Sequence, residues 1–490
     1  MRQQPVQGTR ENTQSEIVGI HGAGATAPSL VPMTTGRAGV ATATVVTAVS
    51  VVTMILGYLN KARCTGAPFD EAGRSLVFDR IKDSSVCYSD IQFLWLDRGI
   101  DQHIFPYLNG GISADGTLIG GTVEYPVLSG ILMWIGGLAS HTDAQFLFYS
   151  AVLLAPFGAL TAWMLGRTVG SIALLWSAGP ALILYAFHNW ELPVVATAVG
   201  AVYVMSTTWP LRVRACLAAA LLAVGFCLKL YPGAFVLPLA LFVLVGGRGG
   251  RELAVPGRLD VRGAAAVVAV AGAVVAAVNL PFALLGYDGW RASFAFQEMR
   301  EADITTNSIW YWGLRVLYAT PSTSPETSEA NEAAYQSMVS VLSPMFVLAA
   351  FAAALWFGWR RYGTEGTYPW IQISAVMLAS FLLFHKVHSP QYTLWLVPFF
   401  VLLRIPWQVV TAYLLADLVM GIGVFKYFAA LSSGSDASTE ENVVLVGVWG
   451  RAALLVVLIV LFARSRERRH SESPVRVVDP PSPRITEVSA

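Results

Sequence analysis

Residues 368–403 read YPWIQISAVMLASFLLFHKVHSPQYTLWLVPFFVLL. Two apolar runs flank a short polar stretch that holds His385, Lys386 and His388. Ionisable groups are costly inside a bilayer, so a cationic stretch between two apolar runs is either a hydrated loop or part of a functional site. The segment therefore predicts a helix pair in a membrane with several ionisable groups at one end.

The composition of the whole chain also indicates a membrane protein. Of its 490 residues, 55% are hydrophobic and 13% are charged, whereas soluble domains carry about 25% charged residues. Apolar windows of roughly 15–23 residues recur, as helices that cross a hydrocarbon layer of about 30 Å require. Transmembrane β-strands would alternate apolar and polar residues, and these windows do not. We expect an all-α polytopic membrane protein, and the net charge of +1 argues against nucleic acid as a partner.

The apolar windows predict twelve spans in a bundle that occupies residues 37–464. The predicted spans lie near residues 38–59, 144–165, 172–187, 192–207, 213–228, 233–245, 264–284, 338–357, 370–384, 392–403, 407–425 and 443–462. Residues 60–143 form a long loop after the first span. Within it, residues 124–140, EYPVLSGILMWIGGLAS, are short and flanked by polar segments. We expect them to form a helix that lies in the membrane interface.

Arginine in the short loops sets the orientation, because cytoplasmic loops carry an excess of Lys and Arg. With twelve spans, these arginines share one face with both termini, residues 1–36 and 465–490, which are polar and expected to be disordered. That face is predicted to be the cytoplasmic face of a plasma membrane. The arginines are Arg167, Arg212, Arg214, Arg248, Arg251, Arg258, Arg262, Arg360, Arg361, Arg404 and Arg464. Arg451 falls inside a span, so it either faces the bundle interior or marks a misplaced boundary.

The opposite, extracytoplasmic face receives loop 60–143, residues 286–335 and the motifs AFHNWELP, CLKLYPG and FHKVHSPQY. Cysteine usage agrees, because Cys64 and Cys87 lie in that loop. An oxidising exterior favours a disulfide that closes about two dozen residues and contributes roughly 3 kcal/mol on the entropic model. The alternative is two free thiols packed against apolar neighbours. No CxxC motif or His/Cys cluster indicates zinc.

Asp90 is a candidate general base. It lies in VCYSDIQFLWLDRGIDQHIFPY, at the beginning of a predicted helix whose Ile91, Leu94 and Trp95 cover one side. A carboxylate can take the proton from an attacking hydroxyl, which typically contributes 10²–10⁴-fold to a rate. The alternative is a carboxylate that satisfies backbone donors in the first turn of its helix.

Lysine stands at two predicted outer helix ends. Lys229 ends a span in GFCLKLYPGAF, where it either extends to the interface or meets an anion, because an unpaired buried ammonium is costly. Lys386 repeats the pattern between His385 and His388, where the helix dipole also favours cations. Two such ends beside proline turns make an anion site more plausible than one alone.

Further polar residues on this face suit a sugar phosphate. Arg300 has the fork geometry for phosphate oxygens, and Trp310 suits either a sugar ring or an interfacial aromatic belt. The motif AFHNWELP adds His188, Asn189 and Glu191, whose amide and carboxylate could hold hydroxyl groups. The combination predicts an amphiphilic phosphate ester with its lipid tail among the helices.

Seven motifs in this order resemble the GT-C superfamily of glycosyltransferases that use polyprenyl-phosphate sugars. They are similar, more narrowly, to the actinobacterial glycosyltransferase family 87 with its polyprenol-phosphate-mannose-dependent mannosyltransferases. The motifs are CYSD, EYPVLSGILMW, FHNWELPVVATA, LKLYPGAF, VNLPFALLGYDGW, READITTNSIWY and HKVHSPQYTLWLVP. The resemblance covers residues 38–462. It implies a GT-C-type bundle, an interfacial helix at EYPVL and an extracytoplasmic active site that serves glycolipid biosynthesis in the cell envelope.

The resemblance also implies residue roles, with Asp90 as the catalytic base. The residues implied for the donor phosphate are Lys229, Arg300, His385 and Lys386. Those implied for substrate binding are His188, Asn189, Glu191, Glu124, His388, Gln391 and Trp310. The implied reaction is direct displacement with inversion at the anomeric carbon. A phosphate monoester leaving group needs less charge neutralisation than a nucleotide diphosphate, so neither a metal nor another cofactor is expected.

Mannose is favoured as the transferred sugar only through the family, and arabinofuranose is the alternative. A transporter or lipid-linked sugar flippase is the main competitor, and a noncatalytic scaffold is a third possibility. Transporters usually show internal repeats and ionisable groups near the bilayer midplane, whereas this sequence shows no clear repeat and gathers its polar groups on one face. The expected partners are a polyprenyl-phosphate sugar, a glycolipid or glycan acceptor and the lipid bilayer.

Overall fold

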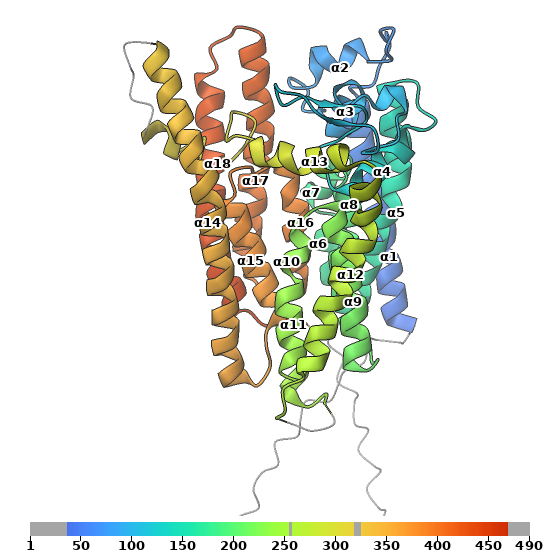
Figure 1. Cartoon of the computed structure of the whole chain (residues 1–490), viewed down its shortest axis with the longest axis vertical. Coiled ribbons are helices and arrows are strands. Elements are labelled where there is room, and N and C mark those ends of the chain that lie inside the picture. Colours follow the sequence, from blue (N-terminus) through green and yellow to red (C-terminus); the bar gives the residue numbers. More distant parts are fainter. Residues whose placement is uncertain (1–36, 254–256, 318–324, 469–490) are drawn as a thin grey trace, which may run out of the picture. The chain divides into compact units, whose positions relative to one another are not determined.

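The computed structural model describes residues 37–253, 257–317 and 325–468. The disorder predicted for residues 1–36 and for residues from 469 on lies outside the described residues. Long helices run along a common axis, and the shorter elements α2, α3 and α13 lie at one end of them, which we call the α3 end (Figure 1). We call the opposite end, which holds Arg248, Arg361 and Arg404, the arginine end.

Eight helical stretches in the described residues are long and apolar enough to cross a membrane. Five are single helices: α1 (Arg37–Ala62), α9 (Leu211–Leu228), α12 (Val261–Leu285), α17 (Trp407–Ser432) and α18 (Ser438–Arg464). A sixth is most of α14 (Pro325–Glu365). The other two are composite: α5 (Asp143–Val169) with η2 (Gly170–Ala173) and α6 (Leu174–Ser177), and α10 (Tyr231–Ala234) with α11 (Val236–Leu244) and η3 (Arg248–Gly250). The prediction of a polytopic helical membrane protein is confirmed.

Four of the twelve predicted spans are short or broken helices in the structure. The span predicted near residues 172–187 divides into α6 and α7 (Pro180–Tyr185), since Pro180 begins a new helix. The other three correspond to α8 (Glu191–Met205), α15 (Trp370–Phe384) and α16 (Thr393–Leu402), of 15, 15 and 10 residues. All ten residues of α16 are buried. Most residues of α8 and α15 are buried as well, so these shorter helices are largely enclosed by protein.

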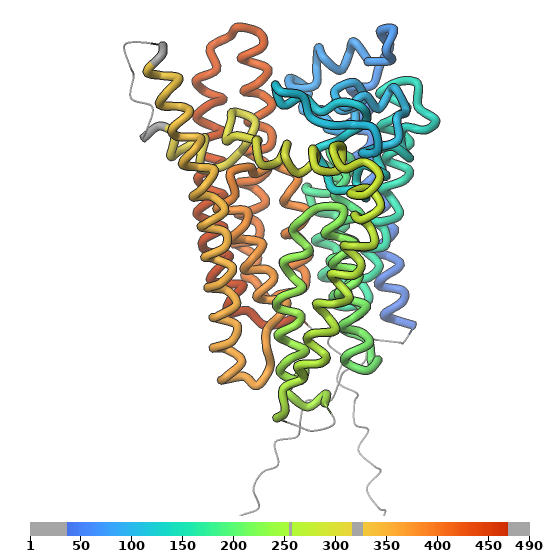
Figure 2. The backbone as a smooth tube through the Cα atoms, viewed as in Figure 1, coloured from blue at the N-terminus to red at the C-terminus, as the bar shows by residue number. Residues whose placement is uncertain are grey.

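Residues 63–142 gather at the α3 end (Figure 2). The segment contains α2 (Leu76–Ile81), α3 (Asp90–Asp97), η1 (Ile100–Gln102), the hairpin β1 (Gly111–Ile112) and β2 (Leu118–Ile119), and α4 (Val127–Gly137). The prediction of only helices therefore missed a short antiparallel hairpin. The helix expected over residues 124–140 is shorter, because it begins after Pro126. A disulfide joins Cys64 to Cys87.

Three further elements lie in the connections between the long helices. Helix α13 (Tyr287–Met299) follows α12 and lies across the bundle axis rather than along it (Figure 1). The short helices η4 (Leu314–Leu317) and η5 (Pro390–Tyr392) lie in the connections before α14 and α16. These connections carry the polar motifs that the sequence singled out.

Small residues let α1 and α5 approach closely. A methyl group at Gly166 of α5 would come within 2.9 Å of the Ala43 Cα of α1. Such close backbone contact is typical of helix pairs in membranes, where packing and not water exclusion drives association. This pair anchors the start of the chain against the helix that follows loop 60–143.

The chain turns back on itself at the arginine end. Residues 465–468, which were predicted to begin a disordered tail, lie against residues 402–405. Leu403 pairs with Glu467 in an antiparallel bridge, and the Arg468 amide donates to the Leu402 carbonyl at 2.8 Å. Arg361 donates to the carbonyls of Ala463 and Ser465 at 2.7 and 2.8 Å. We call residues 465–468 the C-terminal strap.

Candidate active site

Asp90 is the first residue of α3, and its carboxylate is held by side chains from distant parts of the sequence. Its Oδ2 accepts from Asn189 Nδ2 at 2.7 Å and from Gln391 Nε2 at 3.4 Å. The backbone is also fixed, because the Asp90 amide donates to the His188 carbonyl at 2.8 Å. These hydrogen bonds hold the carboxylate in place, and the Asp90 side chain is still 21% exposed.

His188 lies directly beside Asp90. Its Nε2 is 3.9 Å from Asp90 Oδ2, which exceeds hydrogen-bond length, and its ring is 5.6 Å from the Tyr88 ring. Burial lowers the pKa of His188 to about 3, and the positive charge of Lys61 adds to this effect. The imidazole is therefore neutral at physiological pH, so it approaches Asp90 as a dipole and not as a cation.

Lys61, in the last turn of α1, belongs to the same group and was not predicted. Its Nζ donates to the Tyr88 carbonyl at 2.6 Å and lies 3.3 Å from His188 Nδ1, and the residue is only 3% exposed. The signal in the sequence was a lysine at the end of the first apolar run. A lysine there is so often an interfacial residue that its spacing did not single it out.

Asn189 links Asp90 to a second group of residues. Its Nδ2 also donates to the Tyr125 hydroxyl at 2.8 Å, and the Lys229 Nζ lies 5.0 Å from the centre of the Tyr125 ring. Lys229 caps the carboxyl end of α9 and is 8% exposed. Two side chains, Asn189 and Tyr125, thus connect the carboxylate to the lysine.

Lys229 forms a buried ion pair with Glu191, the first residue of α8. Glu191 Oε2 also accepts from Trp395 Nε1 at 2.5 Å. A buried charge needs a partner, and here the two residues predicted for phosphate and hydroxyl groups partner each other. An anion that binds Lys229 would therefore compete with Glu191.

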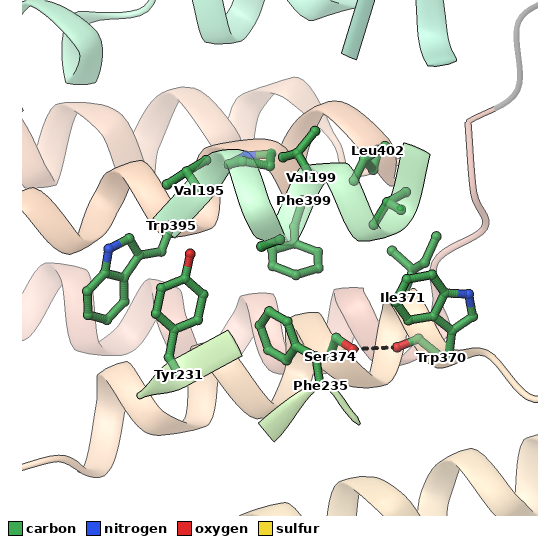
Figure 3. Close-up of a pocket in the computed structure, with 13 residues that line it drawn as sticks. Val195, Val199, Tyr231, Phe235, Trp370, Ile371, Ser374, Trp395, Phe399 and Leu402 are labelled. Carbon is green, nitrogen blue, oxygen red and sulfur yellow. Dashed lines mark hydrogen bonds between the residues drawn. The ribbon is translucent and has the colours of Figure 1, made fainter. Parts of the chain in front are cut away.

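The Lys229–Glu191 pair lies at one end of an apolar pocket between α8, α10, α15 and α16. Figure 3 shows Tyr231 and Trp395 at this end of the pocket and Trp370, Ile371 and Leu402 at the other. The enclosed space is small, about 20 Å³, which is roughly the room that one water molecule needs, so the lining side chains nearly fill it. The Tyr231 and Trp395 rings stack with centroids 4.3 Å apart. The pocket thus joins an apolar interior to a charged pair.

The two histidines of HKVHSPQ are held by backbone groups. His388 is 2% exposed, with Nδ1 2.9 Å from the Leu382 carbonyl, and His385 Nδ1 lies 2.8 Å from the Val387 carbonyl. Burial lowers the pKa of His385 to about 4 and that of His388 well below its usual value. Both rings are neutral near pH 7, so they can offer an N–H group to a phosphate but not a positive charge.

Arg300 and Lys386 lie together at the end of α13. Lys386 Nζ donates to the Glu298 carbonyl at 3.1 Å, and burial lowers its pKa while Glu301 partly offsets this. The Arg300 charge acts on Lys386, on His385 and on Tyr125. Within the described ranges no hydrogen bond or ion pair joins Lys386 to Asp90 or Lys229. Arg300 is the cation that lies between the two groups.

Glu124 and Trp310 serve neighbouring protein groups in this structure. Glu124 Oε2 accepts from Arg98 Nε at 2.6 Å, and Glu124 precedes α4. Trp310 is 2% exposed, and its Nε1 donates to the Phe384 carbonyl at 2.8 Å. Both were predicted to bind substrate, and neither presents an unoccupied polar group to the Asp90 group.

A second buried network lies behind the His388 segment. Arg451 faces the bundle interior, where its Nη1 is 3.6 Å from Asp417 Oδ1 and its Nη2 donates to the Asn307 carbonyl at 2.7 Å. Asp417 also accepts from Tyr185 at 3.0 Å and from Thr393 at 2.6 Å. Asp417 was not predicted, although a carboxylate inside an apolar run is itself a signal.

Among the described residues, no three His, Cys, Asp or Glu side chains lie close enough together to hold a metal ion. No protein-family model and no curated protein matches the chain. Among solved structures, the chain is similar to ArnT from Cupriavidus metallidurans bound to undecaprenyl phosphate. The identity is 14% and the TM-score 0.39, over 84% of this chain and 76% of that one. At this distance no residue role is carried over from that protein.

Proposed function

We propose that the chain is a membrane glycosyltransferase that transfers a hexose, most favourably mannose, from a polyprenyl-phosphate donor to a glycolipid or glycan acceptor. One observation carries the proposal. A partly exposed carboxylate, Asp90, is connected through Asn189 and Tyr125 to the Lys229–Glu191 pair at the mouth of an apolar pocket. A base beside a cation and an apolar, aromatic-lined pocket suits an acceptor hydroxyl and a lipid phosphate.

In the proposed reaction, Asp90 takes the proton of an acceptor hydroxyl as its oxygen attacks the anomeric carbon. The bond between that carbon and the phosphate oxygen breaks, and the electron pair leaves with polyprenyl phosphate. One displacement inverts the anomeric configuration. The donors from Asn189 and Gln391 to Oδ2 hold the carboxylate in a single orientation, which favours a productive geometry.

The departing phosphate needs positive charge or N–H donors. We assign Lys229, Arg300 and Lys386 as the cations, and His385 as a neutral donor. Lys229 is already paired with Glu191. Donor binding would therefore draw the ammonium partly away from Glu191, while Arg300, near both Tyr125 and Lys386, supplies charge from the opposite side.

The lipid part of the donor would enter between α8 and α16, where the side chains that line the narrow pocket would have to move apart. Val195, Val199, Phe235 and Phe399 line its middle, and the polar Trp395 Nε1 faces Glu191 at its end. Burial of each methylene of a polyprenyl chain contributes about 0.8 kcal/mol. The tail can thus supply binding energy that the sugar does not.

We place the site on the extracytoplasmic face of a plasma membrane, with both termini cytoplasmic. The support is the arginine distribution, since Arg248, Arg361 and Arg404 lie at the end opposite α3. Lipid-linked sugars are the activated donors available on that side.

A transporter of lipid-linked sugars is the second candidate, and the buried Asp417–Arg451 pair within α17 and α18 favours it. Proteoliposomes that contain a labelled polyprenyl-phosphate sugar separate the two functions. Movement of label between leaflets without an acceptor product would support transport. An acceptor product would support transfer.

The direct test incubates purified protein in nanodiscs with polyprenyl-phosphate mannose, or the arabinofuranose donor, and envelope lipid acceptors. Asp90→Asn should lower turnover by at least about 100-fold, the lower range for a general base, without loss of donor binding. Asp97→Asn is the matched control, because Asp97 ends the same helix with a side chain that is 40% exposed. Full activity of Asp90→Asn would exclude Asp90 as the base.

A further inference from the structure

Lys61 is a buried ammonium whose contacts are a carbonyl and an imidazole. Its Nζ lies 2.6 Å from the Tyr88 carbonyl and 3.3 Å from His188 Nδ1. Asp90 is close enough for its charge to act on Lys61, but His188 stands between them, with Nδ1 toward the lysine and Nε2 toward the carboxylate. The imidazole is therefore a bridge between a cation and the candidate base.

The chemistry of the three groups selects one tautomer of His188. An ammonium has three donors and no acceptor, so a contact with His188 Nδ1 requires a lone pair on that nitrogen. A neutral imidazole with a lone pair on Nδ1 carries its proton on Nε2. The Nε2–H group then faces Asp90 Oδ2 across 3.9 Å.

We propose that Lys61 is a positioning residue that holds His188 in the Nε2–H tautomer, so that an N–H dipole and not a lone pair faces Asp90. This role rests on the proposed function only in its consequence for catalysis. The tautomer follows from the contacts of Lys61 with its amine protonated, and it does not depend on the reaction.

The Tyr88 carbonyl explains what happens without Lys61. The Tyr88 carbonyl is also within reach of the His188 ring and can accept a hydrogen bond from it. When the ammonium is removed, the Tyr88 carbonyl loses a donor and His188 Nδ1 loses its proton-donating partner. Both losses are relieved if the His188 proton moves to Nδ1, and Nε2 then presents a lone pair to the Asp90 carboxylate. Two acceptors facing each other repel, so the carboxylate loses its fixed position.

The charged and titratable groups around Asp90 define what a pH profile reports. They are Lys61 of α1, Tyr88 before α3, Tyr125 before α4, His188 before α8 and, beyond Tyr125, Glu191, Lys229 and Arg300. Lys61→Met removes a positive charge that interacts with Asp90. A nearby positive charge favours an ionised carboxylate, so the acidic limb of kcat/KM should move to higher pH in this variant.

The test measures the tautomer directly. The full chain in nanodiscs, with ¹⁵N-labelled histidine, gives imidazole nitrogen shifts that distinguish a protonated from an unprotonated nitrogen. His188→Gln identifies the His188 signals among those of the seven histidines. We expect Nε2–H in the wild type and in Lys61→Arg, and Nδ1–H in Lys61→Met. Nδ1–H in the wild type would overturn the proposal without any reference to catalysis.

Activity provides the second readout. Lys61→Met should lower kcat by about 10-fold or more, the order expected when a general base is misoriented, with donor KM unchanged. Lys61→Arg should recover most of the loss.

Arg63→Met is the matched control, because Arg63 is an exposed cation just beyond the end of α1. Normal kcat and pH profile in Lys61→Met would refute the role. Absence of transferase activity in the wild type, with the expected tautomer, would refute the proposed function alone.

Discussion

Asn189 Nδ2 lies 2.7 Å from Asp90 Oδ2, although 99 residues separate the two in the sequence. The same nitrogen lies 2.8 Å from the Tyr125 hydroxyl, so one amide orients the carboxylate and joins it to the residues around Lys229. The arrangement makes Asn189 a structural element of the site as well as a candidate ligand for substrate hydroxyls.

Replacement of Asn189 by Ala removes the shortest hydrogen bond to Asp90. We expect kcat to fall by about 10- to 100-fold, because a hydrogen bond to a charged group contributes roughly 1.5–3 kcal/mol. Initial rates with a labelled polyprenyl-phosphate sugar measure the change. Asn109→Ala, at an exposed position in the same end of the bundle, should leave the rate unchanged. Equal rates for Asn189→Ala and wild type would show that Gln391 alone orients the base.

The Lys229–Glu191 pair predicts a stability effect that separates from donor use. Lys229→Met leaves Glu191 buried without its cation, which should cost about 3–5 kcal/mol of the free energy of unfolding. The double variant Lys229→Met/Glu191→Gln removes both charges and should regain most of that stability but not donor affinity. Thermal unfolding and donor KM report the two quantities. A double variant with normal donor KM would move the phosphate site away from Lys229.

Obstruction of the apolar pocket should discriminate between donors by tail length. Val199 lines the middle of the pocket, so Val199→Trp should raise KM for a long polyprenyl donor much more than for a donor with a short prenyl tail. Leu237→Trp, on the exposed face of α11, is the control for added bulk. If both variants treat the two donors alike, the tail binds elsewhere on the bundle.

The buried Asp417–Arg451 pair predicts a long-range effect on the site. Arg451 holds the Asn307 carbonyl, and the Asn307 amide donates to the His388 carbonyl at 3.0 Å. Arg451→Met should therefore lower both the unfolding temperature and activity, at a cost of about 3–5 kcal/mol from the unpaired Asp417. Arg466→Met, an exposed arginine of the C-terminal strap, is the control. Unchanged unfolding in Arg451→Met would show that Asp417 is neutral in the native protein.

Hydropathy predicted where helices lie better than it predicted which of them span. The exposed α12 was placed to within a few residues, because a lipid-facing helix must be apolar over its whole length, whereas α14 extends well beyond the predicted residues 338–357 at both ends. The enclosed α16 has the same composition at ten residues. Local composition does not distinguish contact with lipid from contact with protein, so the sequence did not indicate which apolar runs form short, enclosed helices.

The candidate site was predictable in its residue types and not in its pairings. Asp90 was expected at the beginning of a helix and lies there. Its bonds to Asn189 and Gln391, like the pairing of Lys229 with Glu191, join segments tens to hundreds of residues apart. Helical periodicity carries no information about such contacts. Lys61 was not predicted for the same reason, because its partners Tyr88 and His188 lie in other segments of the sequence.

The C-terminal strap has a practical consequence for handling this protein. Leu402 lines the inner end of the pocket, and its carbonyl accepts the Arg468 amide. A chain truncated after Arg464 would lose that hydrogen bond together with the bridge between Leu403 and Glu467. Affinity tags and fusion partners therefore belong beyond Arg468, and any minimal folded version of the protein should retain residues 465–468, which support this end of the pocket.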